Sequence, residues 1–418
     1  MFESFFPKPK LFFGSLVIYA AIVVGIWYSV GDSIATSLGF ALPEAGAPPV
    51  IGLGFFITPQ FLWFYLFYTV VTLIFWAAWQ RYSPHKWHLW SILGSSVILF
   101  TTYYGVQVSV AINHWRRPFG DMLQNALTGE NNVTSADFME LMVIFAQIAF
   151  MAVVVFTLTR FFVSHYVFRW RRAMTDYYMA HWKRVRHVEG ASQRIQEDTQ
   201  RFASIVEGLG VSIVDSIMTL FAFLPILLDL SQYVTELPIV GAIPAPLMTA
   251  VLFWSLFGTV LMAVIGIKLP GLYFRNQRVE AAFRKELVLG ENNEERAGPI
   301  TISELFSNVT RNYFRLYFHY LYFNVARSLY LQADNIFAYF ILVPTMVAAK
   351  ITYGILQQIL TAFSQVSNSF QFLVNSWPTI VELLSIHKRL VSFDAAIADQ
   401  PLPQIDQDYM ASDSKLDG

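Results

Sequence analysis

The feature that most constrains this chain is a set of long apolar stretches, because a soluble core has little use for so many of them. Six such stretches occur, at residues 11–31, 60–80, 87–112, 141–159, 208–228 and 245–267. Only the fifth contains a charged side chain, Asp215. Since about 20 apolar residues in a helix cross the hydrocarbon core of a bilayer, the six stretches predict membrane-spanning helices.

Two further stretches are less regular. Residues 316–349 are interrupted by Arg327 and Asp334, and residues 351–380 are uncharged but rich in amides and hydroxyls. They bring the predicted count to eight spans, with seven as the alternative. Only 14% of the residues are charged, against about 25% in a typical soluble domain. The predicted fold is therefore an all-α, polytopic membrane helical bundle.

The basic residues predict the orientation of these spans. With a cytoplasmic N-terminus, eight spans place the loops near residues 81–86, 169–204 and 268–315 inside, together with both termini. These segments hold most of the 28 Lys and Arg residues, whereas the outside loops hold only Arg116, Arg117 and Lys350. We therefore expect a multi-pass protein with both termini in the cytoplasm.

Two of the inside segments are predicted to extend helices beyond the bilayer. Residues 169–201 contain no proline and one glycine, and residues 272–289 contain neither. On a continuous helix Glu189 and Glu207 would be five whole turns apart, with Glu197 on a neighbouring face. Glu280 and Glu291 would nearly eclipse on the second helix.

These carboxylates are candidates for proton transfer. Ionisable groups near a span are costly and often mark a transport pathway, and burial moves a carboxyl pKa toward neutrality. Glu207 lies where a charged segment meets an apolar one and is the strongest candidate. The alternative for Glu189, Glu197, Glu280 and Glu291 is an ordinary ion pair with a nearby arginine on a solvated helix.

A polar stripe runs along the last predicted span. Its members recur every three or four residues and are Gln357, Thr361, Gln365, Asn368, Gln371 and Asn375. Because lipid penalises polar groups, such a stripe should face water or another polar surface within the bundle. It predicts one wall of a hydrophilic cavity, with a polar seam between helices as the alternative.

Other chemistry lacks a sequence signal. The chain has no cysteine and no Gly-Lys dipeptide, so it contains no thiolate metal site and no Walker phosphate loop. About 25 residues follow the last helical region, which ends near Phe393, and these are too few for a nucleotide-binding domain. His85 and His88 share a helix face without a nearby carboxylate, and the net charge of −1 argues against a nucleic-acid partner. We expect no enzyme, no metal and no cofactor.

Seven segments resemble the SbmA/BacA peptide transporters of bacterial inner membranes, most closely the rhizobial members. They are residues 1–9 (MFESFFPKP), 90–94 (WSILG), 161–171 (FFVSHYVFRWR), 196–204 (QEDTQRFAS), 266–272 (GIKLPGL), 276–287 (NQRVEAAFRKEL) and 312–320 (NYFRLYFHY). The resemblance extends from Met1 to about Phe393.

The resemblance implies more than the residues do. It implies the transmembrane fold of an ABC exporter without the ATPase, a homodimer, and proton-driven import of peptides, including antimicrobial, defensin-like and antibiotic peptides. It implies a role in symbiosis, and it places the family's acidic ladder at Glu197, Glu207, Glu280 and Glu291. No ATP would be used.

The expected organisation follows from the resemblance and from composition. Residues 1–86 would be added N-terminal helices, residues 87–393 a six-helix core with long cytoplasmic extensions, and residues 394–418 a disordered cytoplasmic tail. One alternative function stays open, because residues 279–284 (VEAAFR) resemble a motif of fatty-acyl ABC transporters. That alternative is transport of very-long-chain acyl or lipid substrates powered by a separate ATPase subunit.

Overall fold

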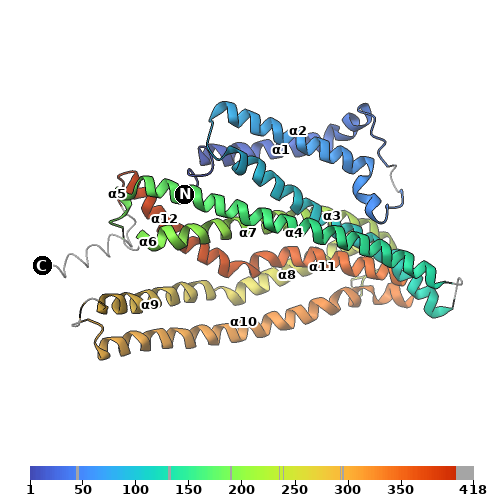
Figure 1. Cartoon of the computed structure of the whole chain (residues 1–418). Coiled ribbons are helices and arrows are strands. Elements are labelled where there is room, and N and C mark those ends of the chain that lie inside the picture. Colours follow the sequence, from blue (N-terminus) through green and yellow to red (C-terminus); the bar gives the residue numbers. More distant parts are fainter. Residues whose placement is uncertain are drawn as a thin grey trace. The chain divides into compact units, whose positions relative to one another are not determined.

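The computed structural model describes residues 1–401, apart from residues 44–46, 130–132, 189–190, 235, 239, 292 and 294–295. The described residues are almost all helical, and their one β pairing is the isolated bridge between Leu237 and Gly241. The predicted all-α membrane bundle is confirmed. The α-helices of Figure 1 are α1 (Pro9–Ser37), α2 (Pro59–Tyr82), α3 (Ser95–Thr128), α4 (Ser135–Ala180), α5 (Trp182–Val185), α6 (Ala191–Gln193), α7 (Thr199–Leu230), α8 (Pro246–Gly266), α9 (Leu269–Gly290), α10 (Pro299–Val347), α11 (Tyr353–Asn375) and α12 (Trp377–Ile397).

Six helical segments are long and apolar enough to cross a membrane. They are Pro9–Ser37, Pro59–Tyr82, Leu89–Thr128, Ser135–Ala180, Ala191–Tyr233 and Pro246–Tyr273. Each coincides, to within two residues at its start, with one of the six apolar stretches found in the sequence or contains it entirely, which confirms those predictions. Large apolar side chains such as Val17 and Phe253 are 69% and 71% exposed, as expected of surfaces that face lipid.

The seventh and eighth predicted spans are helical, as α10 and α11, but are not among these six apolar segments. Their lengths of 49 and 23 residues suffice to cross a bilayer. Their place in the membrane stays a prediction, because their polar side chains lower the hydropathy that identifies a span.

The described chain forms two compact units, and each is considered by itself. The first contains Met1–Met218, Thr352–Gln358 and the described residues from Leu383 onward; the second contains Thr219–Ile351 and Ile359–Glu382. The predicted division into added N-terminal helices up to residue 86 and a six-helix core over residues 87–393 stays a prediction.

An aromatic core holds the first unit together. Phe5 is fully buried and stacks on Trp170 of α4, with ring centroids 5.6 Å apart. Phe202 of α7 packs edge-on against the same indole at 5.9 Å, and Phe393 of α12 packs against Tyr178 at 5.2 Å. Such pairs add about 1 kcal/mol each beyond the area they bury. The N-terminal segment, α4, α7 and α12 therefore share one core.

The helix α12 continues past the predicted start of the disordered tail. Asp394 lies in its last turn, where its Oδ1 accepts a hydrogen bond from the Tyr178 hydroxyl at 3.1 Å and its Oδ2 lies 3.2 Å from the Met1 ammonium. The prediction of disorder from residue 394 is therefore wrong up to Ile397, because these contacts hold the turn in the core. Residues 402–418 of the predicted tail lie outside the described residues.

The predicted continuous helix over residues 169–201 is also wrong. The helix α4 ends at Ala180, and the short α5 and α6 lie between it and the start of α7. Val185, Val188 and Ala191 are buried in the core of the first unit, so the burial of this connection outweighs the helix propensity of the segment. Glu189 lies outside the described residues.

Two glycines bring α3 and the start of α11 into backbone contact. A side chain at Gly120 would collide with the backbone of Gly354, and Gly354 donates its N–H to Asp121 Oδ1 at 3.1 Å. Nearby, Asn113 is fully buried and donates to the carbonyl of Gln358 at 2.9 Å. This close approach fixes the first turn and a half of α11 within the first unit.

The second unit contains the long pair α9 and α10, which lie side by side in Figure 1 and contact each other along much of their length. Asn312 of α10 donates to Asn276 Oδ1 of α9 at 3.1 Å, and both side chains are buried. At the turn between the helices, Glu286 accepts from the Ala297 N–H and forms an ion pair with Arg296 at 3.6 Å. Both ends of this helical hairpin are thus held by polar contacts.

Candidate functional site

Glu197 lies in a π-helical turn, Arg194–Asp198, directly before α7. Its Oε1 is 2.7 Å from Nη2 of Arg201, and its Oε2 accepts a hydrogen bond from Gln193 Nε2 at 3.0 Å. The Glu197 side chain is 42% exposed. Its geometry is that of the ion-pair alternative, and its role in proton transfer stays a prediction.

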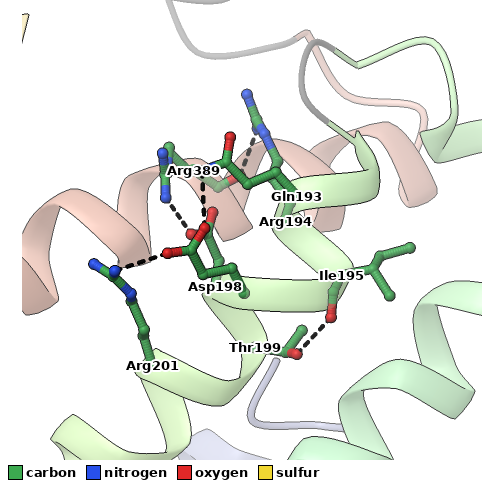
Figure 2. A network of polar contacts seen from close by, with 8 residues as sticks. Gln193, Arg194, Ile195, Asp198, Thr199, Arg201 and Arg389 are labelled. Atoms are coloured by element: carbon green, nitrogen blue, oxygen red, sulfur yellow. Dashed lines mark hydrogen bonds and ion pairs between the residues drawn. The ribbon is translucent and has the colours of Figure 1, made fainter. Parts of the chain in front are cut away.

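The next residue, Asp198, is fully buried and was not singled out by the sequence. Its Oδ1 forms an ion pair with Nη2 of Arg389 on α12, as Figure 2 shows. Arg194 donates to the carbonyl of Arg389 at 2.6 Å, and its guanidinium lies 5.6 Å from the Phe393 ring centroid. The two arginines and Asp198 thus tie α12 to the π-helical turn.

Only part of this network could be predicted from the sequence. Arg194 and Asp198 are four residues apart in a charged segment, a spacing that favours contact on one helix. The partner that decides which carboxylate is buried, Arg389, lies 191 residues away along the chain. A π-helical turn adds one residue to the helix repeat, which changes the direction of neighbouring side chains and is frequent at functional sites.

Glu207 lies in α7 of the first unit, two turns beyond this network. Its side chain is half-buried, and it makes no ion pair or hydrogen bond with any residue that the structure describes. Gly208 and Gly210 follow it, and a Cβ added at either glycine would meet no atom within 4 Å. Glu207 is thus the one predicted carboxylate of this unit that lacks a fixed partner among the described residues, and the helix surface at Gly208 and Gly210 is open.

Glu280 and Glu291 lie in the second unit, on and directly after α9. Glu280 is half-buried, whereas Glu291 is exposed and its N–H caps α9 by donating to the Leu287 carbonyl at 3.1 Å. The four predicted proton-coupling residues are therefore divided between the two units. A single ladder that connects all four stays a prediction.

The predicted polar stripe follows the open side of α11 at most positions. Gln357, Thr361 and Gln365 are half-buried, and Asn368 and Asn375 are exposed. Gln371 differs, because it is buried and donates to Ser367 Oγ at 3.2 Å. Five of the six positions can thus contribute to a polar wall, whereas Gln371 contributes to packing.

The described surface also has an open hollow of about 550 Å³ on the first unit. It is lined by α4 and the connection that follows, including Arg171, Asp176, Trp182 and Gln196. No residue of the α11 stripe lines it. The predicted polar wall and this hollow are separate features.

The two histidines considered for metal binding, His85 and His88, both contact nearby backbone groups. His88 Nε2 lies 2.7 Å from the Ser83 carbonyl, and His85 Nδ1 accepts from the Trp87 N–H at 3.2 Å. Burial lowers the pKa of His85, with a smaller contribution from His88. Among the described residues, no group of three histidine, aspartate or glutamate side chains could hold a metal ion.

Comparison with known proteins yields two kinds of match. The sequence profile of the SbmA/BacA-like family matches residues 84–398. An uncharacterized ABC transporter ATP-binding protein of Synechocystis is 25% identical over 49% of this chain and 30% of its own length. The inner membrane ABC transporter ATP-binding protein YddA of Escherichia coli is 24% identical over 52% of this chain and 40% of its own length. The chain thus spans less than half the length of these curated relatives.

The apolar helices and these matches together define a multi-pass membrane protein of a transport class. Since the profile covers most of the sequence, the chain belongs to the SbmA/BacA-like family.

Proposed function

We propose that this protein imports peptides across the bacterial inner membrane by alternating access, driven by the proton gradient. The observation that carries the proposal is Glu207, a half-buried carboxylate in a helical segment long and apolar enough to cross a membrane, with no ion pair to a described residue. Burying a carboxylate without a counter-ion is costly, and taking up a proton lowers that cost. Proton binding is therefore linked to the opening and closing of the transport cavity.

In this proposal Glu207 is the principal proton carrier, and Glu197, Glu280 and Glu291 relay protons or gate access. The open positions of the α11 stripe line the transport cavity, and a second copy of the chain encloses it, because twofold dimers are the commonest closed assemblies. A hydrated polar wall accepts many peptides, which suits antimicrobial and defensin-like substrates and a role in symbiosis. Both termini lie in the cytoplasm.

Uptake of a labelled peptide by purified protein in liposomes, with an imposed pH gradient and no ATP, tests the proposal. Wild-type protein should accumulate peptide, and a protonophore should abolish accumulation. Glu207→Gln keeps the volume but not the titratable group, so uptake should fall at least tenfold. The exposed Glu140 supplies the control Glu140→Gln, which should transport normally. Equal uptake by both variants would refute the assignment of Glu207.

The polar wall has its own test within the same assay. Thr361→Leu, Gln365→Leu and Asn368→Leu combined should leave insertion intact and abolish uptake, because they remove three members of the open stripe. Gln371→Leu serves as a packing control, since Gln371 is buried and is expected to affect stability before selectivity. Normal uptake by the triple variant would make the stripe a seam between helices.

A second candidate is transport of very-long-chain acyl or lipid substrates with a separate ATPase subunit. It is supported by the relatives, both named as ABC transporter ATP-binding proteins and both much longer than the matched stretch. Strict dependence of transport on ATP and on an added ATPase subunit would favour this candidate over proton-driven import.

A further inference from the structure

A single carboxylate, Asp334 of α10, joins three helices of the second unit. Its Oδ1 accepts a hydrogen bond from Trp254 Nε1 of α8 at 2.7 Å and a second from Ser367 Oγ of α11 at 2.9 Å. The sequence shows Asp334 only as an interruption in an apolar stretch. Its role as the meeting point of α8, α10 and α11 comes from the fold.

Polar and aromatic groups complete the surroundings of this carboxylate. Gln371 donates to Ser367 Oγ at 3.2 Å, and the Tyr330 hydroxyl donates to the Trp254 carbonyl at 3.4 Å. The Trp254 indole stacks on the Phe337 ring with centroids 4.0 Å apart and on the Tyr330 ring at 5.5 Å. Oδ1 is therefore held by oriented neutral donors beside an aromatic stack.

No cation compensates the Asp334 charge within the described part of this unit. The sequences of α8 and α11 contain no Asp, Glu, Lys, Arg or His, and no ion pair of Asp334 with a described residue occurs. The nearest charged residue on α10 is the exposed Arg327, two turns away, and the nearest titratable group is Tyr330. A carboxylate in apolar surroundings without a counter-ion is costly, and taking up a proton removes that cost.

We propose that Asp334 is a second proton-binding site, whose protonation loosens the contacts that hold α8 and α11 to α10. The inference rests on the proposed proton-driven transport. Hydrogen bonds to an ionised acceptor are about twice as strong as those between neutral groups. A proton that adds to the carboxylate removes its negative charge, so the bonds from Trp254 and Ser367 weaken together. Ser367 and the polar stripe both belong to α11. Protonation of Asp334 therefore affects the position of the cavity wall through this helix.

Spin labels can read this change directly, because the chain contains no cysteine. Phe253→Cys on α8 and Ile336→Cys on α10 place two labels at positions that are 71% and 66% exposed. The distance distribution between the labels should change in wild-type background between mildly alkaline and acidic pH. Asp334→Asn, which cannot titrate, should give one distribution at both pH values.

Two further variants keep the test decisive. Asp229→Asn replaces an exposed aspartate of the same unit and should retain the wild-type pH response. Ser367→Ala removes one of the two donors to Oδ1, so the label distances at alkaline pH should already move toward those of the wild type at acidic pH. If Asp334→Asn responds to pH as wild type does, or Ser367→Ala leaves the label distances at alkaline pH unchanged, the proposal is wrong.

Transport separates this proposal from the one on which it rests. Asp334→Asn should lower proton-driven peptide uptake at least tenfold at equal amounts of folded protein, whereas Asp229→Asn should not. If wild-type protein shows no uptake with a pH gradient, proton-driven import is wrong, while the label distances still decide whether Asp334 binds a proton. Full uptake by Asp334→Asn alongside active wild type would overturn the coupling role of Asp334 alone.

Discussion

Asp198 in the first unit and Asp334 in the second are both held by hydrogen bonds from other helices, but only one has a counter-ion. Asp198 is fully buried and paired with Arg389, whereas Asp334 is half-buried and receives bonds only from neutral donors. A paired charge is needed in its ionised form, because losing it strands the partner. A carboxylate without a counter-ion can lose its charge by taking up a proton, because no partner is then left uncompensated. The comparison separates carboxylates that hold the fold from carboxylates that can take part in transport.

The largest effect on stability is expected where a pair is broken. Asp198→Ala leaves Arg389, which is 43% exposed, without its partner and should lower the free energy of unfolding by about 2 kcal/mol. The double variant Asp198→Asn with Arg389→Gln removes both charges together and should recover much of this loss. Chemical unfolding of purified protein in detergent measures both. A double variant as unstable as Asp198→Ala would contradict the pairing.

A second destabilising substitution is expected at Asp394, the carboxylate of α12 that contacts both the N-terminus and Tyr178 of α4. Asp394→Asn removes the charge that compensates the buried Met1 ammonium, whose pKa burial lowers and Asp394 partly restores. We expect a loss of about 2 kcal/mol. Asp399→Asn is the control, because Asp399 is 81% exposed and forms only a surface pair with Arg184. Equal melting temperatures for the two variants would refute the role of Asp394.

The surface pair of Glu197 should matter far less. Both side chains of the Glu197–Arg201 pair are about half exposed, and such pairs contribute at most about 1 kcal/mol. Arg201→Ala should therefore leave the melting temperature nearly unchanged. Comparing Glu197→Gln with Arg201→Ala in the uptake assay then isolates the carboxyl group itself. A transport defect in Glu197→Gln alone would support the predicted relay, and two silent variants would assign Glu197 to the ion pair.

The smallest effect is a pH dependence at His387 of α12. Burial lowers the pKa of His387, and the charge of Asp394 opposes the shift. The unfolded chain therefore binds this proton more readily, so the contribution of His387 to stability is present above pH 6.5 and decreases as the pH falls through this value. His387→Gln should reduce the acid sensitivity of the melting temperature slightly, because the side chain is partly solvated. His187→Gln, at an exposed position, should not change it.

Much of the fold follows from local sequence, and the failures have a common cause. The six apolar stretches lie in helices as predicted, because a run of about 20 apolar residues signals a span without tertiary information. The break after Ala180 and the extension of α12 to Ile397 were missed, because both depend on burial against distant residues.

In the candidate site, too, the features set by local sequence could be predicted and those set by distant contacts could not. The periodicity of the α11 stripe placed five of its six positions on an accessible side, but it could not show that Gln371 turns inward to Ser367. Glu197 is predicted from its helix face and from the family resemblance, whereas the burial of Asp198 depends on Arg389, whose contact no local pattern encodes. Glu207 could be selected from sequence because a charge beside an apolar stretch is itself a local signal.

The shared core of the first unit also has a consequence in time. Met1 meets Asp394 across 393 residues of chain, and Tyr178 meets the same carboxylate across 216. At translation rates of about 5–20 residues per second, α12 emerges roughly 20–80 s after the N-terminal segment. During biogenesis Tyr178 and the Met1 ammonium therefore lack their partners on α12 while the earlier helices insert, and a nascent chain stalled before α12 would expose this part of the core to proteases and chaperones.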